Sequence, residues 1–491
     1  METVHDKRIV SAEIELALGR YTSSGEQVAA PREVLFDRLG FRRDGSRVYL
    51  DRGAREDVFP EFAFPECASV VELIARIQHL RWSELSGRLH DAGSEYFIDC
   101  VATLGIGHLP GQPRTALGIH ENYLTFLSPE RLTHALAPFF ATRALLAGGG
   151  GLDPDTPFRE GQPAFLLSPR SLVTTQLLAA ESLGRRPYVK NSQEHHCGKS
   201  EPESLLRRFQ VIGGDPLLTE VGMLLQFGAT LAMIRLTESH PLPEPLRRYD
   251  PRHFITDLDS TNRLFAAHKL VGLEQGYSAL ECQFLCLEAC EERQETLFRH
   301  SEDRLILRYW RRVLEALRTE GWEGVSGLTD YGTKFRLLTD FFEEAQIPTT
   351  HDGAMHLFSV LLALSRLGGR EEESLAGAFS PQADDSALDV VWIAPQQGRE
   401  PLKPPTNTRA AARAQLLHST QVSASFSELE GLSSGLFLNW DGLYQKASNL
   451  ISPLVVFPDP RECYTAELKS FLSGTWESLN RLVQPSRLQR T

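Results

Sequence analysis

Apolar and polar residues alternate along two short stretches near the beginning of the chain. In KRIVSAEIELAL (residues 7–18), small or apolar residues alternate with Ser11, Glu13 and Glu15. In SRVYLDRG (residues 46–53), which follows the turn signal RDG, the residues of one parity are Arg47, Tyr49 and Asp51. A period of two predicts β-strands, so each strand presents several polar side chains on a single face.

Other stretches have the spacing of amphipathic helices. Residues 68–90 and 129–149 are of this kind, and the second ends at the glycine run 148–151. Residues 207–238 predict a strand, a Gly-Gly-Asp-Pro turn and a helix capped near Thr219. Three further segments are expected to be mostly helical: residues 266–320, 331–346 and 354–367.

The composition changes near residue 370. Residues 368–387 are polar and rich in small residues, and residues 395–409 are rich in proline. We therefore predict a large domain over residues 1–394 and a small C-terminal domain over residues 395–491.

Composition and charge exclude several classes of protein. Hydrophobic residues make up 42% of the chain and charged residues 23%, which is typical of a globular protein. The formal net charge of −13 disfavours a nucleic-acid partner, because the phosphate backbone requires a basic surface. No apolar run is long enough to span a membrane, and METVHDKRIVSAEIE lacks the apolar centre of a signal peptide, so we expect a cytoplasmic protein.

Three sequence features resemble ligand sites but favour other interpretations. The glycines at 148–151 follow a helix and lack the Lys-Ser/Thr of a phosphate loop, which favours a helix cap and loop. The segment QEHHCG (193–198) lacks the spacing of a zinc site. Cys282, Cys286 and Cys290 share one helix face, where a buried apolar stripe is favoured over metal binding.

The polar strand faces leave two interpretations open. In an antiparallel sheet such faces usually point to solvent. The alternative is a site for a hard cation such as Mg²⁺, which prefers oxygen ligands and bridges to phosphates. The candidate groups are those of the two strands together with Glu61, Glu66, His120 and Glu121. Asp51, beside such a site, is placed to act as a general base toward an amine.

Several motifs occur in the order seen in one protein family. They are RIVSAEIE, GSRVYLD, PEFAFPEC, GIHENYL, RRPYVKNSQEHH, RRFQVIGGD and PPTNTRAAARA. In combination they resemble the Pup ligase/Pup deamidase family of glutamine-synthetase-like carboxylate-amine ligases. The resemblance implies an α+β fold in which a curved antiparallel sheet, packed by helices, cradles ATP and Mg²⁺, with a small C-terminal domain beside the nucleotide.

The resemblance also implies an activity and its partners. In the ligase, ATP phosphorylates the terminal glutamate of the small protein modifier Pup, and an acceptor lysine or other amine attacks the acyl phosphate. The deamidase uses the same site to hydrolyse the terminal glutamine or the isopeptide bond. The stretch between the first two strands (residues 17–45) is short, as in the ligase. A deamidase-like enzyme and a non-catalytic regulatory homologue remain the alternatives.

Matching motif by motif transfers roles to individual residues. The metal ligands would be Glu13, Glu15, Tyr49 and Glu61, and the general base would be Asp51. The nucleotide contacts would be Arg47, His120, Arg409, Arg413 and Trp440.

This chain departs from the family pattern at several supporting positions. Phe64 replaces a threonine that contacts the nucleotide, and Gln210 replaces a histidine. NSQEHHCG and CVATLGIGH also differ from the family motifs at their positions. The resemblance is therefore stronger for ATP and metal binding than for the identity of the modifier.

Overall fold

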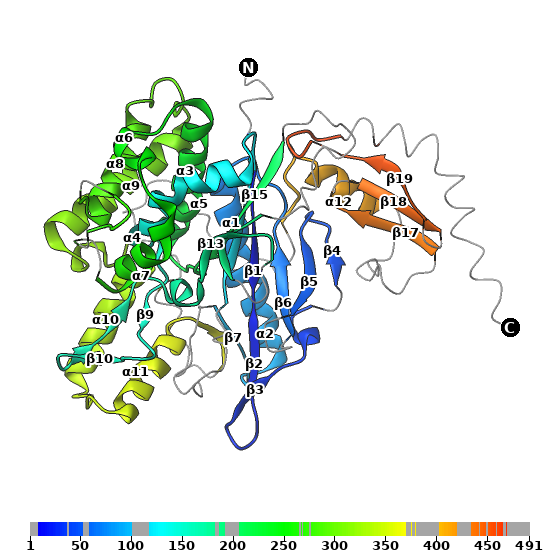
Figure 1. Cartoon of the computed structure of the whole chain (residues 1–491). Helices are drawn as coiled ribbons and strands as arrows, with labels where there is room; N and C mark the ends of the chain where they lie inside the picture. Colours follow the sequence, from blue (N-terminus) through cyan, green and yellow to red (C-terminus); the bar gives the residue numbers. More distant parts are fainter. Residues whose placement is uncertain are drawn as a thin grey trace.

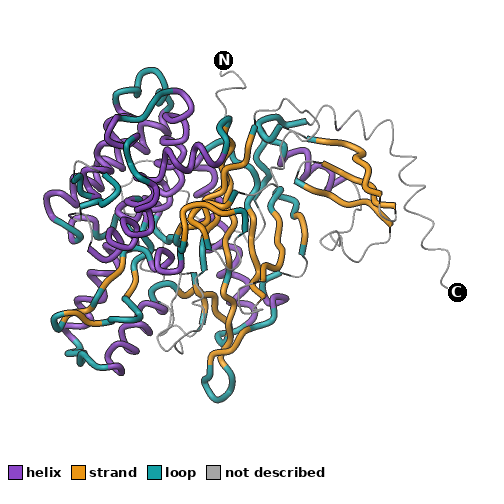
Figure 2. Tube along the Cα trace, in the orientation of Figure 1, coloured by secondary structure: helices purple, strands orange, loops and turns teal. Residues whose placement is uncertain are grey.

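The computed structural model places an antiparallel-rich sheet between a helical layer and a small C-terminal sheet (Figures 1 and 2). The structure describes residues 8–36, 39–52, 58–100, 117–181, 186–191, 206–264, 267, 269–273, 276–369, 375, 379, 402–419, 434–440, 442–447, 450–457, 459–464 and 468. This arrangement confirms the predicted α+β fold. The predicted domain boundary at 394/395 and the segment QEHHCG lie outside the described residues.

The central sheet has eight strands in the order β13-β14-β15-β8-β1-β6-β5-β4. Their bounds are β1 Val10–Glu15, β4 Gly40–Phe41, β5 Arg47–Arg52, β6 Val58–Ala63, β8 Ile119–Thr125, β13 Gln176–Ala179, β14 Pro187–Lys190 and β15 Arg207–Gly214. Neighbouring strands are antiparallel, except that β13 and β14 are parallel. Both strands predicted from alternation, at residues 7–18 and 46–53, are therefore present.

A second sheet has four strands, one of which, β2, follows β1 directly in the chain. Its order is β16-β7-β2-β3, with β2 Ala17–Tyr21, β3 Gln27–Ala29, β7 Tyr96–Asp99 and β16 Arg366–Gly368. The prediction of helix through residue 367 is wrong at its end, since α11 stops at Ala363 and β16 follows. The reason is tertiary: β16 pairs with β7, and Arg366 Nε donates to Asp99 Oδ1 at 2.8 Å.

The α-helices before residue 364 lie mostly to the left of the central sheet in Figure 1, except α1 and α2, which lie near its middle. They are α1 Val70–His79, α2 Ser86–Ala92, α3 Pro129–Thr142, α4 Ala144–Ala147, α5 Glu220–Ser239, α6 Glu244–Arg247, α7 Phe254–Leu264, α8 Ala279–Glu291, α9 Ser301–Glu320, α10 Asp330–Glu344 and α11 His351–Ala363. Helix α1 contacts β1, α5 contacts β8 and α3 contacts β15. Apolar burial between these layers is the main force that holds the sheet in place.

A local sequence signal begins helix α5 as predicted, whereas another predicted helix is interrupted. The Thr219 hydroxyl accepts a hydrogen bond from Gly222 N and caps α5. The helix predicted over residues 68–90 is interrupted by a π-helical turn at Leu80–Leu85, between α1 and α2.

The glycine run 148–151 forms a buried loop after α4. Gly150 has a φ of +68°, and a Cβ there would lie 2.6 Å from the Tyr331 Cα. Gly151 begins β9 (Gly151–Leu152), which pairs with β12 (Phe165–Leu166). A second short hairpin is formed by β10 (Phe158–Arg159) and β11 (Gln162–Pro163). The glycines therefore serve close packing, which agrees with the predicted cap and loop.

The three cysteines of α8 are completely buried in the helical layer. Cys282 Sγ contacts Pro138 O at 3.5 Å, and Cys290 Sγ contacts Met233 Sδ at 3.9 Å. Burial raises the pKa of Cys286. These contacts confirm the predicted apolar stripe. Among the described residues, no helix is both long and apolar enough to cross a membrane.

The C-terminal part consists of α12 (Ala410–Ser419) and a three-stranded antiparallel sheet. The strands are β17 Ser434–Asn439, β18 Gly442–Ala447 and β19 Leu450–Val456. Phe41 of β4 is buried together with Ala412, Leu416, Leu438 and Phe457. One side chain of the central sheet is thus part of the hydrophobic core of the C-terminal region.

The segment HENYL divides its side chains between the two faces of β8. His120 and Asn122 lie on the open face, whereas Glu121 and Tyr123 are buried on the helix-covered face. Glu121 accepts hydrogen bonds from Arg143 Nη1 at 2.8 Å and from the Tyr123 hydroxyl at 2.6 Å. Glu121 therefore does not belong to the polar face with which its sequence position grouped it.

Replacing Glu121 by glutamine is expected to destabilise the protein by about 3–5 kcal/mol. The substitution leaves the guanidinium of Arg143, which is 3% exposed, without its buried counter-charge. Urea unfolding followed by circular dichroism measures the effect. Asp250→Asn, which breaks an exposed pair with Arg252, is the control and should change the midpoint little. Equal midpoints for the two variants would contradict the structural role of Glu121.

Candidate functional site

The open face of the central sheet gathers polar side chains from four adjacent strands. The register places Glu13 opposite His120 and Glu15 opposite Glu61. It also places Tyr49 opposite Glu61. Directly paired residues of neighbouring strands point to the same face, so alternation along each strand brings these groups together.

Three side chains form a compact group of possible metal ligands. One ligand atom each from Glu13, Glu61 and His120 lies within 4.8 Å of the others. His120 Nδ1 is 3.4 Å from Glu13 Oε2 and 3.2 Å from Glu61 Oε1. On its other side, His120 Nε2 is 3.9 Å from Glu15 Oε1. The predicted ligands Glu13, Glu15 and Glu61 therefore surround His120, which the resemblance had placed at the nucleotide.

Mutual contact shifts the ionisation of these groups. Burial disfavours the charged form of Glu13, but Arg208 and His120 outweigh it and lower its pKa to about 2. Burial raises the pKa of Glu61 to about 7. For His120, burial is outweighed by Glu13 and Glu61, which raise its pKa to about 10. A protonated His120 thus supplies the positive charge that several adjacent carboxylates require.

Glu15 and Tyr49 border the same group. Gly118 N donates to Glu15 Oε2 at 2.6 Å, and Arg170 Nη1 lies 3.8 Å from that oxygen. Burial and the negative charges of Glu13 and Glu61 raise the pKa of Tyr49. Its phenol is therefore neutral at physiological pH.

Arg208 was not singled out from the sequence, yet it contacts the centre of the site. Its Nη2 lies 2.7 Å from Glu13 Oε1, and its Nε donates to Asn122 Oδ1 at 2.7 Å. Gln210 Nε2 donates to Glu13 Oε2 at 3.2 Å. The sequence does contain a signal for Arg208. Arg208 and Gln210 are two residues apart on β15, so they point to the same face of the strand that pairs with HENYL.

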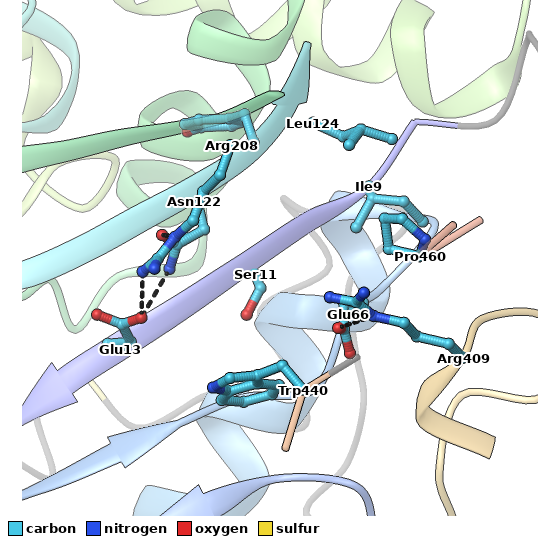
Figure 3. A pocket seen from close by; sticks show the side chains of 11 residues that line it. Ile9, Ser11, Glu13, Glu66, Asn122, Leu124, Arg208, Arg409, Trp440 and Pro460 are labelled. Carbon is cyan, nitrogen blue, oxygen red and sulfur yellow. Dashed lines mark hydrogen bonds and ion pairs between the residues drawn. The ribbon is translucent and has the colours of Figure 1, made fainter. Parts of the chain in front are cut away.

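A cleft extends from Glu13 to the C-terminal region, and Figure 3 shows its lining side chains. The lining residues are Ile9, Ser11, Glu13, Glu66, Asn122, Tyr123, Leu124, Arg208, Arg409, Trp440 and Pro460. In Figure 3, Glu13, Asn122 and Arg208 lie on one side of the Trp440 indole, and Glu66 and Arg409 lie on its other side. This combination suits a ligand with one anionic end and one flat, apolar end.

Trp440 and Arg47 lie on either side of Phe41. The Trp440 ring packs edge-on against Phe41, with 5.0 Å between the ring centroids. The Arg47 guanidinium lies 5.2 Å from the Phe41 centroid and 5.7 Å from the Tyr49 centroid. The structure thus brings the predicted nucleotide residues Arg47 and Trp440 to the same region as the metal-ligand group.

The other two arginines predicted at the nucleotide are occupied by Glu66. Arg409 lines the cleft and its Nε donates to Glu66 Oε1 at 2.7 Å. Arg413 is completely buried and binds both carboxylate oxygens of Glu66. Glu66, one of the carboxylates collected from the sequence, therefore lies away from the metal-ligand group.

Phe64 is a position where the chain departs from its family pattern. Phe64 is buried in the core against Phe62, and its carbonyl accepts a hydrogen bond from Ser11 Oγ at 2.8 Å. The backbone of Asp51, in β5, pairs with that of Phe59, in β6. The Asp51 side chain lies outside the described part of the structure, so its role as a base stays a prediction from the sequence.

Comparisons with known proteins agree with the motif pattern. The family model described as Pup-ligase protein matches residues 111–429. A Pup–protein ligase of Acidimicrobium ferrooxidans is 27% identical over 443 residues, which is 84% of this chain and 90% of that protein. A Pup–protein ligase of Micrococcus luteus is 34% identical over 321 residues, which is 61% of this chain and 64% of that protein.

Solved structures share the fold. The ligase PafA, in a crystal structure of its complex with the prokaryotic ubiquitin-like protein Pup, has a TM-score of 0.70 and 20% identity. That match covers 98% of this chain and 97% of PafA. A structure of PafA in complex with ADP has a TM-score of 0.66 and 20% identity, and the match covers 90% of this chain and 91% of that chain.

Proposed function

Because this chain belongs to the Pup-ligase family, we propose that it is an ATP-dependent ligase that joins the terminal glutamate of Pup, or of a Pup-like modifier, to an amine of a protein. The observation that carries the proposal is that Glu13, a member of the carboxylate–histidine group, lines the same cleft as Trp440. Scattered cysteines, three of them buried in α8, suit an enzyme of the reducing cytoplasm.

The residues present fit a divalent cation. Glu13 and Glu61 offer carboxylate oxygens, and His120 would offer an imidazole nitrogen once a bound cation displaces its proton, all within 4.8 Å of one another. Glu15 borders the group. Two or three carboxylates would favour Mg²⁺, which prefers oxygen ligands. Bound there, Mg²⁺ would neutralise charge on the phosphates during phosphoryl transfer.

The remaining residues take roles set by their places in the cleft. Arg208, at the centre of the site, and Arg47, beside Tyr49, would contact phosphate oxygens, for which guanidinium groups are suited. Trp440 would pack against the base of the nucleotide. Residues 395–491 would therefore form a domain that contributes to the nucleotide site.

Asp51 would accept the proton of the attacking amine. An ammonium ion has no free electron pair, so the acceptor must lose a proton before it attacks the activated glutamate. One isopeptide bond would then form for each ATP consumed, with ADP and phosphate as the other products.

Ligation is favoured over hydrolysis for two reasons. The compared relatives are Pup–protein ligases, and the segment between the first two predicted strands, residues 17–45, is short, as in the ligase. A deamidase on the same scaffold would not consume one ATP per product. A non-catalytic homologue would neither release ADP nor bind ATP.

Incubation of the chain with ATP, Mg²⁺, an acceptor protein and a Pup-like protein ending in glutamate is expected to give a conjugate. Its mass should equal that of the two proteins less one water, and ADP should form in equal amount. Intact-mass spectrometry and an ADP assay measure the two products. A modifier ending in alanine is the control, since it lacks the side-chain carboxylate to be phosphorylated. Product without ADP, or ADP without product, would contradict the proposal.

A further inference from the structure

Two segments far apart in the chain meet at Glu66, whose carboxylate is buried. Glu66 follows β6, and its side chain is 8% exposed. Arg409 and Arg413 reach it from the start of α12, with 5% and 0% of their side chains exposed. The Thr408 hydroxyl donates to Glu66 O at 2.9 Å. A carboxylate in this position ties the central sheet to the C-terminal region.

The two arginines continue the contacts beyond Glu66. Arg413 Nη1 donates to Trp440 O at 3.0 Å, and its Nη2 donates to Gly45 O at 3.3 Å. Arg409 Nη1 donates to Phe457 O at 3.1 Å. Because a guanidinium is planar and its donors are fixed, these bonds set the positions of their partners relative to Glu66.

The network also determines the surroundings of the Trp440 ring. The Arg413 guanidinium lies 4.8 Å from the Trp440 centroid and 5.5 Å from that of Phe41. Phe41 in turn contacts the edge of the indole. Trp440 is thus held through its carbonyl, its ring face and its ring edge.

The two arginines keep the carboxylate of Glu66 ionised. Burial disfavours ionisation of Glu66, but Arg413 and Arg409 outweigh it and lower its pKa to about 2. The carboxylate is therefore ionised at physiological pH, and both arginines have a buried counter-charge. Removing that charge would leave two buried cations to repel each other.

We propose that Glu66, Arg409 and Arg413 form a clamp that positions Trp440 for nucleotide binding and are not themselves phosphate ligands. This inference rests on the proposed function, since it assumes that the cleft binds ATP. It differs from the expectation for Arg409 and Arg413 drawn from the resemblance, because both guanidinium groups are committed to Glu66 and to backbone carbonyls.

The clamp acts on binding and not on chemistry. Trp440 is not one of the metal-ligand residues, and in the proposed function it contacts the base of the nucleotide, which does not react, so this contact is equal in the ground state and the transition state. Loss of such an interaction raises KM and leaves kcat unchanged. A base that stacks poorly on a displaced indole should bind about 10-fold more weakly.

The test compares Glu66→Gln and Arg413→Lys with the wild-type chain. ATP affinity is measured by calorimetry, and KM for ATP and kcat by ADP release with the modifier and acceptor. Both variants should bind ATP about 10-fold more weakly, with kcat recovered at saturating ATP. Arg413→Lys keeps the charge, so it remains informative where Glu66→Gln fails to fold.

Two further measurements separate positioning from general loosening. Asp303→Asn removes a pair with Arg235 that is similarly buried, at 9% and 11% exposure, and should leave KM for ATP unchanged. In a Trp440→Ala background, Glu66→Gln should weaken ATP binding no further, because the clamp acts through Trp440.

Either of two results would overturn the clamp: wild-type ATP affinity in Glu66→Gln and Arg413→Lys, or an additive effect in the Trp440→Ala background. The outcome for the proposed function is separate. A wild-type chain that binds ATP but forms no conjugate would refute ligation, while the affinities would still decide the role of the clamp. A wild-type chain that binds no ATP would refute both.

Discussion

Glu13→Gln is expected to lower kcat/KM for conjugate formation by about 10³-fold, which corresponds to about 4 kcal/mol of transition-state stabilisation. Glu13 is the most connected carboxylate of the site, with contacts to His120, Arg208 and Gln210. The amide keeps the shape of the side chain but loses the negative charge that attracts both a cation and the arginine. Phosphoryl transfer would then lack a fixed cation at the transferring group.

The dependence on Mg²⁺ distinguishes this explanation from misfolding. ADP release is measured over a Mg²⁺ titration, and the variant should need a higher concentration for half-maximal activity. Glu26→Gln, at an exposed position of the β2–β3 hairpin, is the matched control and should behave as wild type. A variant with reduced activity but the wild-type Mg²⁺ dependence would remove Glu13 from the proposed ligand set.

Asp51→Asn is expected to slow transfer to a lysine acceptor by about 10²- to 10⁴-fold, the range for loss of a general base. ATP binding should persist, because the proposed metal ligands and nucleotide contacts are unchanged. Conjugate formation under single-turnover conditions, together with calorimetry of ATP, measures the two effects separately.

The choice of acceptor tests the proton-transfer role directly. Hydroxylamine is a nucleophile that is unprotonated at neutral pH and needs no base. With hydroxylamine in place of lysine, Asp51→Asn should form the hydroxamate at close to the wild-type rate. An equal loss with both acceptors would assign Asp51 to activation of the glutamate or to the metal site.

Local patterns predicted much of the secondary structure. Alternation placed Glu13 and Glu15 on one face of a strand, and Tyr49 on one face of another, because side-chain direction along a strand depends only on parity. The capped start of α5 at Thr219 was also predictable, since its signal lies within a few residues. The end of the helix predicted at residues 354–367 was not, because pairing of β16 with β7 overrides local helix preference.

The motif HENYL shows where parity alone is insufficient. Alternation separates His120 and Asn122 from Glu121 and Tyr123, but it does not say which pair faces the helices. Packing decides this, since Glu121 meets Arg143 in the core and His120 meets Glu13 and Glu61 on the open face.

The sequence by itself determined the kinds of chemical group available, their faces along each strand and, through its motifs, the family. Only the tertiary structure decided which groups meet. Glu66 and Arg413 are 347 positions apart in the chain, and their contact depends on how the C-terminal region packs on the sheet. Register between strands and packing between layers are set by burial of the whole core, so they cannot be read from any local pattern.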